Sequence, residues 1–171
     1  ELSPGRIRIY RLPCPRGGRG SNRERLWSYG HFMASAFRSG RRAPRPDVVV
    51  GSIQPMFTGL AAWQVARQAR VPLVLEVRDL WPDALVVKGA MRRWQAAPLY
   101  WMESALYQAA DRIVSLTPGI KIELIRKGVP AWKIDVYPNG FNPSLFAIES
   151  GTREDVRARR GWGDDRVLIY T

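Results

Sequence analysis

The chain contains the stretch Leu73-Val74-Leu75-Glu76-Val77-Arg78-Asp79-Leu80-Trp81-Pro82-Asp83. It is a mostly apolar run that ends at the charged pair Arg78-Asp79, and the aromatic-proline pair Trp81-Pro82 follows. Apolar, β-branched residues bounded by a breaker predict a strand that is buried on both faces, as in a parallel sheet. Arg78 and Asp79 follow its carboxyl end. In open α/β sheets ligands bind there, because the loops beyond the strand ends form the crevice.

The residues before this stretch predict the rest of one βαβ unit. Asp47–Ser52 reads as a short buried strand, Ile53-Gln54-Pro55 as the loop at its carboxyl end, and Met56–Ala69 as a helix. A right-handed crossover would bring the carboxyl ends of both strands to the same rim of the sheet.

The residues after it continue the alternation of helices and strands. A helix is expected over Arg92–Ala110, a strand over Asp111–Leu116 and a strand over Ile134–Tyr137. Between these strands Thr117 and Pro118 predict the cap and first position of a helix that Gly128 ends. Asn139-Gly140 predicts a turn, since both residues tolerate positive φ.

The helix over 92–110 carries a wide apolar face. Its members are Trp94, Leu99, Trp101, Met102, Leu106 and Tyr107. An aromatic stripe at this spacing favours a place in the core, although partial exposure would make it a membrane or partner surface.

The amino-terminal part predicts a strand, a linker and a helix. Arg6–Leu12 alternates basic with apolar residues, which is typical of a half-exposed edge strand. Gly17-Gly18-Arg19-Gly20 favours a flexible linker over a phosphate-binding loop. Ser21–Ser39 has helical spacing and begins with a Ser21-x-x-Glu24 capping box. His31, on this helix, is given no catalytic role.

The character of the chain changes near Ser150. Thr152–Arg160 predicts a polar helix, residues 161–165 a turn, and Arg166–Thr171 an apolar strand. A buried strand is an unusual end for a protein, so we expect the chain to be cut there.

The composition limits the class of protein. With 171 residues, 46% of them hydrophobic, the chain suits one domain or one domain and part of another. It has no apolar run of the roughly 20 residues that a membrane span needs, and no apolar core of a signal peptide at its start. One cysteine, Cys14, and one histidine predict neither an internal disulfide nor a zinc site.

The net charge of +12 is concentrated near the start, where residues 1–46 hold eleven arginines and two glutamates. An anionic membrane surface, nucleic acid and compositional bias toward arginine would each explain it. No helix-turn-helix, RNP or zinc-finger pattern supports nucleic acid, so a membrane surface ranks above it and no nucleic-acid partner is expected.

Four motifs taken in order resemble the amino-terminal half of a family 4 glycosyltransferase. They are Pro46-Asp47-Val48-Val49-Val50, residues 75–83, residues 110–117, and Val136-Tyr137-Pro138-Asn139-Gly140-Phe141-Asn142 followed by Phe146. The Arg-Asp-Leu-Trp-Pro-Asp block resembles the bacterial branch that builds exopolysaccharide, colanic acid and O-antigen, including N-acetylfucosaminyl transfer.

This resemblance implies an α/β, Rossmann-like domain with a mainly parallel sheet, one half of a GT-B fold and truncated at both ends. Residues 1–150 would form the acceptor-side domain, and residues 151–171 the linker and first strand of the donor-binding domain. The glycine-rich loop and the residues that hold the nucleotide-sugar in the family have no counterpart here. We therefore expect this chain by itself to be inactive.

The resemblance also implies the chemistry. Family members retain the anomeric configuration, and many carry a histidine where Arg78 or Asp79 stands, so these two are the catalytic candidates. The substrate-binding candidates lie at strand ends and in the turn, and they are Ser52, Gln54, Pro55, Trp81, Ser115, Thr117, Asn139 and Gly140. Glu76, inside the strand, favours a structural role in which backbone or an arginine satisfies it. For Arg78 and Asp79 the alternative is that both only anchor the loop.

The expected partners are a nucleotide-sugar donor and a polyprenyl-diphosphate-linked sugar acceptor, with no cofactor and no metal. The expected location is cytoplasmic and peripheral, at the inner face of the plasma membrane. Two alternatives stay open: a nucleotide-sugar 2-epimerase of the same GT-B fold, and a non-catalytic module that docks to a membrane or partner. The epimerase would need a catalytic histidine and carboxylates at strand ends.

Overall fold

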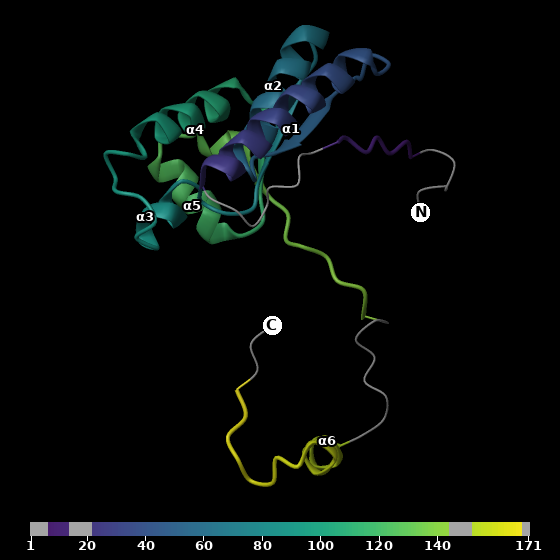
Figure 1. Cartoon of the computed structure of the whole chain (residues 1–171), viewed down its shortest axis with the longest axis vertical. Coiled ribbons are helices and arrows are strands. Elements are labelled where there is room, and N and C mark those ends of the chain that lie inside the picture. The colour runs from purple at the N-terminus through teal and green to yellow at the C-terminus, as the bar shows by residue number, and fades with distance from the viewer. Residues whose placement is uncertain (1–6, 14–21, 144–151, 169–171) are drawn as a thin grey trace. The chain divides into compact units, whose positions relative to one another are not determined.

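The structure is a computed structural model that describes residues 7–13, 22–143 and 152–168 (Figure 1). The chain divides into two compact units, Glu1–Pro138 and Asn139–Thr171, and each is described by itself. The assignment of residues 1–150 and 151–171 to two domains stays a prediction.

A four-stranded sheet organises the first unit. Its strands are β1 (Val49–Ser52), β2 (Leu73–Val77), β3 (Arg112–Ser115) and β4 (Ile134–Val136). They lie in the order β1-β2-β3-β4, and every neighbouring pair is parallel. The mainly parallel α/β class that the sequence predicts is therefore confirmed, and the four carboxyl ends share one rim.

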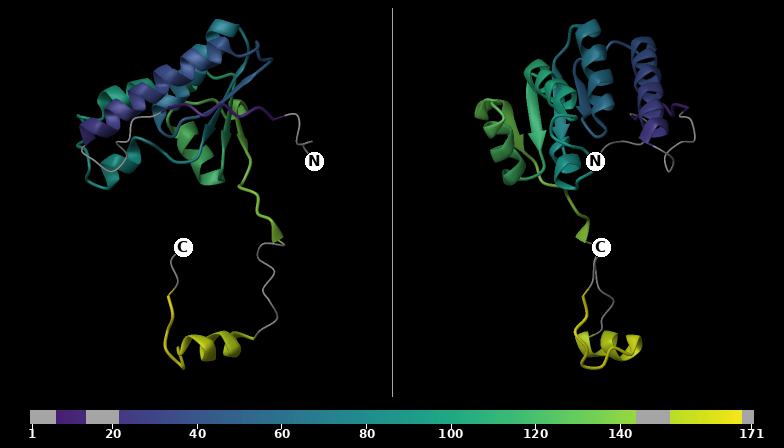
Figure 2. Two further views of the ribbon diagram at one scale, coloured as in Figure 1. Left: turned by 45° about the vertical axis from the view of Figure 1, so that its right-hand side comes forward. Right: turned by 60° about the vertical axis from the view of Figure 1, so that its left-hand side comes forward.

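Helices follow the strands as the sequence predicts. They are α2 (Met56–Ala69), α4 (Ala97–Ala109) and α5 (Pro118–Arg126), and a short 3-10 turn, Ala131–Lys133, precedes β4. Because each strand lies beside its predecessor and crossovers are right-handed, these helices cover one face of the sheet. The long helix α1 (Asn22–Arg42) packs along α2 (Figure 2).

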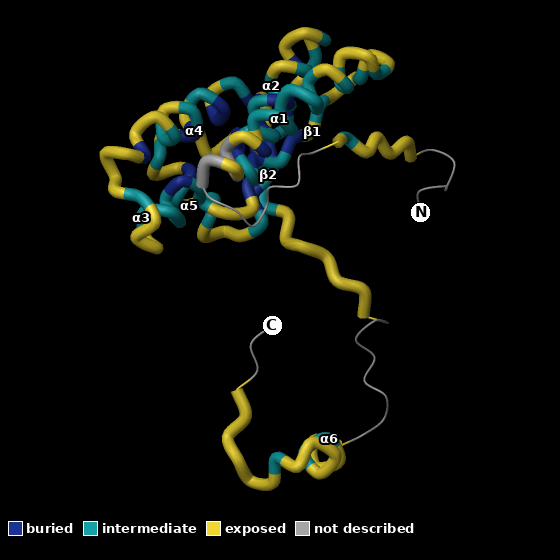
Figure 3. Tube along the Cα trace, viewed as in Figure 1, coloured by how far each residue is buried: buried dark blue, intermediate teal, exposed yellow. Residues whose placement is uncertain are grey.

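The core lies between this face and the helices (Figure 3). Alternate strand residues enter it, among them Leu73, Leu75 and Val77 of β2. Gly51 of β1 is required here, since a Cβ at this position would lie 2.3 Å from that of Ala62 on α2. The members of the core cluster with the smallest exposed fractions are Ile53, Met56, Leu73, Leu75, Val77, Leu106, Ile113, Leu124 and Ile134.

The opposite face of the sheet is not covered to the same degree, so the expectation of strands buried on both faces is wrong for the described residues. Val50 is 68% exposed, while Val74 and Val114 are half-buried. The connectivity explains the difference, because the simple strand order places α2, α4 and α5 on the same side and α1 packs on α2 instead of over the sheet.

The helix expected over Arg92–Ala110 begins later than predicted, at Ala97. Residues 93–96 form a turn instead, and a short helix that the sequence did not indicate, α3 (Asp83–Val87), precedes them. The expected aromatic core face is only half correct. Leu106 and Tyr107 are buried, whereas Trp94 and Trp101 are exposed.

The strand expected over Arg6–Leu12 is wrong for its described part, since residues 7–13 form no strand and Ile7, Ile9 and Tyr10 are exposed. A strand needs a hydrogen-bonded neighbour, and none of the described strands pairs with this segment. The glycine-rich linker at 17–20 and Ser21 of the capping box lie outside the described residues.

In the second unit, α6 (Arg153–Arg160) confirms the predicted polar helix. Thr152 caps it, and the side chain of Asp155 accepts a 2.7 Å hydrogen bond from the backbone N–H of Thr152. The strand expected at Arg166–Thr171 is not formed at residues 166–168, and residues 169–171 lie outside the description. Within this unit the described residues offer no strand for it to pair with.

Candidate functional site

The rim at the carboxyl ends of β1 and β2 brings two of the predicted site residues into contact. The side-chain amide of Gln54 donates a hydrogen bond of 2.7 Å to Oδ2 of Asp79. Gln54 follows β1 and Asp79 follows β2, and the register that pairs Ser52 with Glu76 places the two loops side by side. The bond fixes the Asp79 carboxylate while the carboxylate remains at the surface.

Arg78 has a different partner. Its Nε lies 3.0 Å from Oε2 of Glu76 and its Nη2 donates a 3.1 Å hydrogen bond to Oε1, so the guanidinium and the carboxylate form a two-point pair. The hydrogen bond and the charge of Glu76 raise the pKa of Arg78. The expectation that an arginine satisfies Glu76 is confirmed. The guanidinium uses Nε and Nη2 for Glu76, which leaves its Nη1 edge for a ligand.

Ser52 and Pro55 complete the β1 side of this rim. Ser52 is half-buried and pairs in register with Glu76. Pro55 follows a cis peptide bond and occupies the N-cap position of α2, where no side chain caps the helix. The positive end of the α2 dipole therefore lies at the same rim as Gln54.

Trp81 packs between the Asp79 loop and the hydrophobic core. The Trp81–Pro82 peptide bond is cis, Pro82 is buried, and Trp81 is half-buried against the hydrophobic core. The backbone N–H of Trp81 donates a 3.2 Å hydrogen bond to the carbonyl of Asp79. The ring thus contributes packing that holds the Asp79 loop.

Ser115 and Thr117 lie at the end of β3, and both have structural partners. Ser115 is fully buried, and its hydroxyl lies 3.3 Å from the carbonyl oxygen of Asp135 and 3.5 Å from that of Thr117. The Thr117 hydroxyl accepts a 3.2 Å hydrogen bond from the N–H of Ile120, which confirms its predicted role as N-cap of α5. Thr117 is exposed, while Ser115 is not.

Asn139 and Gly140 belong to the second unit, so they are not part of the rim described here. Both are exposed. The turn predicted for them is wrong, because the structure has no turn at these residues and neither has a positive φ. Tolerance of positive φ permits a turn without requiring one, and here the chain simply continues past β4.

A charged network that the sequence analysis missed anchors the exit of the Asp79 loop. The ammonium of Lys127, after α5, forms ion pairs with Asp83 at the start of α3 and with Glu103 on α4. Its distances to the two oxygens of Glu103 are 2.8 and 2.9 Å. Tyr100 donates a 2.7 Å hydrogen bond to Asp83, and Tyr107 donates one of 2.8 Å to Glu103.

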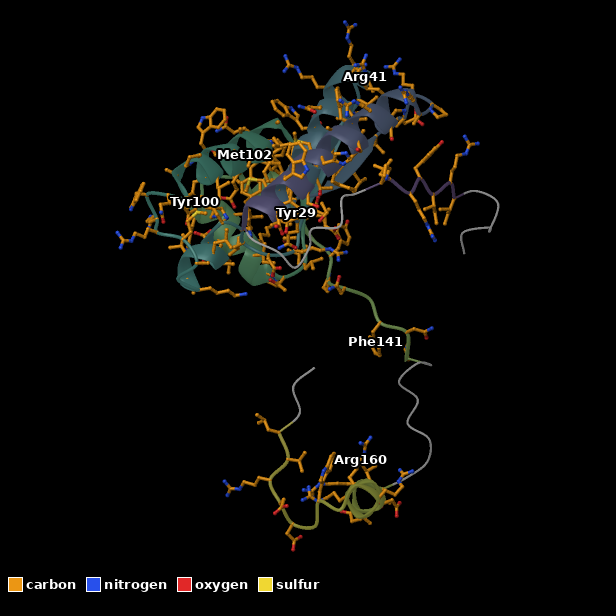
Figure 4. The ribbon with its side chains drawn as sticks, viewed as in Figure 1. Tyr29, Arg41, Tyr100, Met102, Phe141 and Arg160 are labelled. Carbon is orange, nitrogen blue, oxygen red and sulfur yellow. The ribbon has the colours of Figure 1, made fainter. Side chains whose placement is uncertain are left out.

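The network joins α3, α4 and α5. Figure 4 shows Tyr100 where α3 and α4 meet, and Lys127 lies 5.4 Å from the centre of its ring. A signal was present in the sequence, since Glu103 interrupts an otherwise apolar helix face between Tyr100 and Tyr107. A carboxylate in such a place needs a cation, hydrogen-bond donors or protonation to offset its burial.

Burial and pairing shift the pKa values in this network in opposite directions. Burial raises the pKa of Glu103, and the ammonium of Lys127 only partly offsets it. Burial also raises the pKa of Asp83, but the hydrogen bonds from Lys127 and Tyr100 outweigh this effect. The pKa of Asp83 therefore lies below its ordinary value. Burial and the bond to Asp83 raise the pKa of Tyr100 to about 12.

Within the described residues, no group of three or more His, Cys, Asp or Glu side chains could hold a metal ion. His31 lies on α1, and its Nδ1 is buried without a hydrogen-bond partner in the described part of the chain. None of the described helices combines the length and apolar character needed to cross a bilayer.

Residues 1–140, which hold the sheet and this rim, match the family described as glycosyl transferase 4-like domain. The chain belongs to that family. The match covers the whole sheet and the rim that carries Gln54 and Asp79, so these strand ends are part of a glycosyltransferase domain. Such a domain implies a nucleotide-sugar donor and an acceptor. No curated protein matches the chain.

Proposed function

We propose that this chain is the acceptor-side domain of a retaining, metal-independent sugar transferase, which moves a hexosyl or N-acetylhexosaminyl group from a nucleotide-sugar to a polyprenyl-diphosphate-linked sugar. The observation that carries the proposal is the hydrogen bond between Gln54 and Asp79. It holds an exposed carboxylate at the rim where open α/β sheets bind ligands, in a domain whose family transfers sugars.

In this reaction an acceptor hydroxyl oxygen forms a bond to the anomeric carbon as the bond from that carbon to the diphosphate oxygen breaks. The proton of the hydroxyl passes to the departing diphosphate, and attack from the same face retains the anomeric configuration. The protein contributes mainly orientation and stabilisation of the charge on the leaving group.

Asp79 is suited to orienting a sugar hydroxyl. Gln54 occupies Oδ2, so Oδ1 can accept a hydrogen bond from a sugar hydroxyl and fix its direction. The positive end of α2, two residues after Gln54, favours negative charge at the same rim. Asp79 would thus position a hydroxyl.

Arg78 is suited to stabilising the negative charge of the leaving diphosphate. Glu76 holds the guanidinium in place through two contacts, and the guanidinium is protonated at any physiological pH. A cation fixed at the rim can offset phosphate charge as the diphosphate leaves. The pair with Glu76 therefore preorganises Arg78 in this proposal, although the carboxylate offsets part of the positive field at the rim.

The wider setting follows from the motifs. The Arg-Asp-Leu-Trp-Pro-Asp block supports a role in bacterial surface polysaccharide synthesis, with exopolysaccharide, colanic acid and O-antigen as the candidate products. A lipid-linked acceptor would hold the enzyme at the cytoplasmic face of the plasma membrane. The excess of arginine near the start of the chain suits an anionic surface.

The test uses the complete protein and a panel of UDP-, GDP- and dTDP-sugars with a polyprenyl-diphosphate-linked acceptor, each with and without EDTA. We expect transfer from one donor at a rate that EDTA leaves unchanged, and a product whose anomeric configuration equals that of the donor. Loss of transfer in EDTA would contradict metal independence, and inversion would contradict retention.

Two other results would replace the proposal. Interconversion of free nucleotide-linked N-acetylhexosamines without transfer would indicate the epimerase. Binding to vesicles or to a partner protein, with neither reaction, would indicate a docking module.

A further inference from the structure

We infer that residues 84–102, which comprise α3, the turns after it and the first part of α4, form a docking surface for anionic lipid headgroups. We call it the α3–α4 surface. The inference deepens the proposed function and rests on it for the biological setting, but its physical basis is separate. It does not involve the arginines at the start of the chain.

Large apolar side chains stand out from this surface. Val87 is 85% exposed, Trp94 71% and Trp101 75%. The outward side of α4 is marked by exposed residues at helical spacing, which are Ala97, Trp101, Ser104 and Gln108. Trp94 precedes Trp101 by seven residues, or two helical turns, and backbone bonds from the N–H groups of Ala96 and Tyr100 continue the helical path between them.

The charge of the surface has one sign. Residues 84–102 contain Lys88, Arg92 and Arg93, all exposed, and no acidic residue. The nearest carboxylates in the chain, Asp83 and Glu103, flank the segment and both pair with Lys127. Asp83 lies close enough to Arg93 for the positive charge of Arg93 to help lower the Asp83 pKa, whereas Lys88 and Arg92 form no ion pair with any carboxylate in the described part of the chain.

Exposed tryptophans beside exposed basic residues fit a membrane surface better than the surface of a protein partner. Tryptophan prefers the boundary between headgroups and acyl chains, and basic residues beside it attract anionic lipid. The network of Asp83, Glu103 and Lys127 makes the surface a fixed part of the domain, because it ties α3 and α4 to α5. Docking would then hold the nearby Asp79 loop close to a lipid-linked acceptor.

The experiment measures flotation of the complete protein with phosphatidylcholine vesicles that contain or lack phosphatidylglycerol, in the absence of any sugar donor or acceptor. The apolar variant is Trp94→Ser/Trp101→Ser, and its control is Trp132→Ser, an equally exposed tryptophan near β4. The charge variant is Lys88→Gln/Arg92→Gln, and its control is Arg153→Gln/Arg159→Gln at exposed positions of α6. A separate variant, Arg38→Gln/Arg42→Gln at the end of α1, tests the arginine-rich start of the chain.

We expect the protein to float only with vesicles that contain phosphatidylglycerol. Each α3–α4 variant should bind at least about fivefold more weakly, and each control within about twofold of wild type. Circular dichroism should show every variant folded. With a short-chain, water-soluble acceptor the α3–α4 variants should keep wild-type transfer, which separates a docking defect from a defect of the rim.

Three results would overturn the inference. Wild-type protein that does not bind anionic vesicles has no such surface. Binding that Arg38→Gln/Arg42→Gln loses and the α3–α4 variants keep would assign docking to the start of the chain. A dimer in solution that Trp94→Ser/Trp101→Ser converts to monomer, with vesicle binding unchanged, would make the surface a contact between two copies.

Discussion

Nε2 of Gln54 lies 2.7 Å from Oδ2 of Asp79, so two residues that are 25 positions apart in the chain join the ends of adjacent strands. Both are polar groups at the rim of the sheet, and the bond orients one carboxylate oxygen away from the amide. In the proposed function Gln54 positions the Asp79 carboxylate and Asp79 contacts a sugar hydroxyl, so the two roles can be tested one at a time.

The first prediction concerns Gln54. Gln54→Met removes the donor while keeping the length of the side chain, and we expect kcat/KM for sugar transfer to fall three- to tenfold, about 0.7 to 1.4 kcal/mol. The melting temperature should change little. Gln64→Met, at an exposed position of α2, is the matched control. Equal rates for Gln54→Met and wild type would remove Gln54 from the site.

The second prediction concerns Arg78. Arg78→Ala should lower transfer at least tenfold, about 1.4 kcal/mol or more of transition-state stabilisation, and leave the melting temperature nearly unchanged because the side chain is exposed. Glu76→Gln/Arg78→Ala tests the alternative that Arg78 only neutralises Glu76. We expect this double variant to stay as slow as Arg78→Ala. Recovery of transfer would show that the pair is a structural anchor.

The third prediction concerns the stability of the network around Lys127. Lys127→Met leaves Glu103 buried and Asp83 half-buried without their cation, and we expect the free energy of unfolding at neutral pH to fall by about 2 to 4 kcal/mol. Lys88→Met, at an exposed position, should change it by less than about 0.5 kcal/mol. Urea denaturation measures both. Equal stability of the two variants would mean that the network contributes nothing.

The fourth prediction is the pH dependence of the Lys127→Met variant. Burial already raises the pKa of Glu103, and loss of the ammonium raises it further; it also removes part of what lowers the pKa of Asp83, while Tyr100 and Arg93 remain. Groups with raised pKa in the folded state favour folding when protonated, so the variant should gain stability as pH falls from neutral toward about pH 5. A stability difference from wild type that is constant over this range would contradict the assignment.

The strands and most helices could be predicted from local pattern. Met56–Ala69 is a helix with the predicted ends, and the cap at Thr117 is as expected, because breakers and capping residues act within a few positions. The strand predicted near Ile9 could not be judged locally. Strand formation depends on a neighbour that is distant in sequence, and residues 7–13 have none among the described strands.

The site could be predicted only in part, for the same physical reason. The pattern placed Gln54 and Asp79 at strand ends, but their contact depends on the register of β1 and β2. Periodicity grouped Trp94 and Trp101 with Leu106 on one apolar face, yet it does not say which part of a helix face another element covers. The role of Lys127 depends on three helices meeting, which no single segment shows.

The most direct measurement compares wild-type and Asp79→Asn complete protein in the transfer assay with EDTA present, with melting temperatures recorded in parallel. Asparagine can keep an acceptor oxygen for Gln54 but loses the negative charge that orients a hydroxyl. We expect transfer to fall at least tenfold, about 1.4 kcal/mol, with an unchanged melting temperature. Wild-type transfer by Asp79→Asn, or a large fall in melting temperature that accounts for the loss, would contradict a role for this rim in sugar transfer.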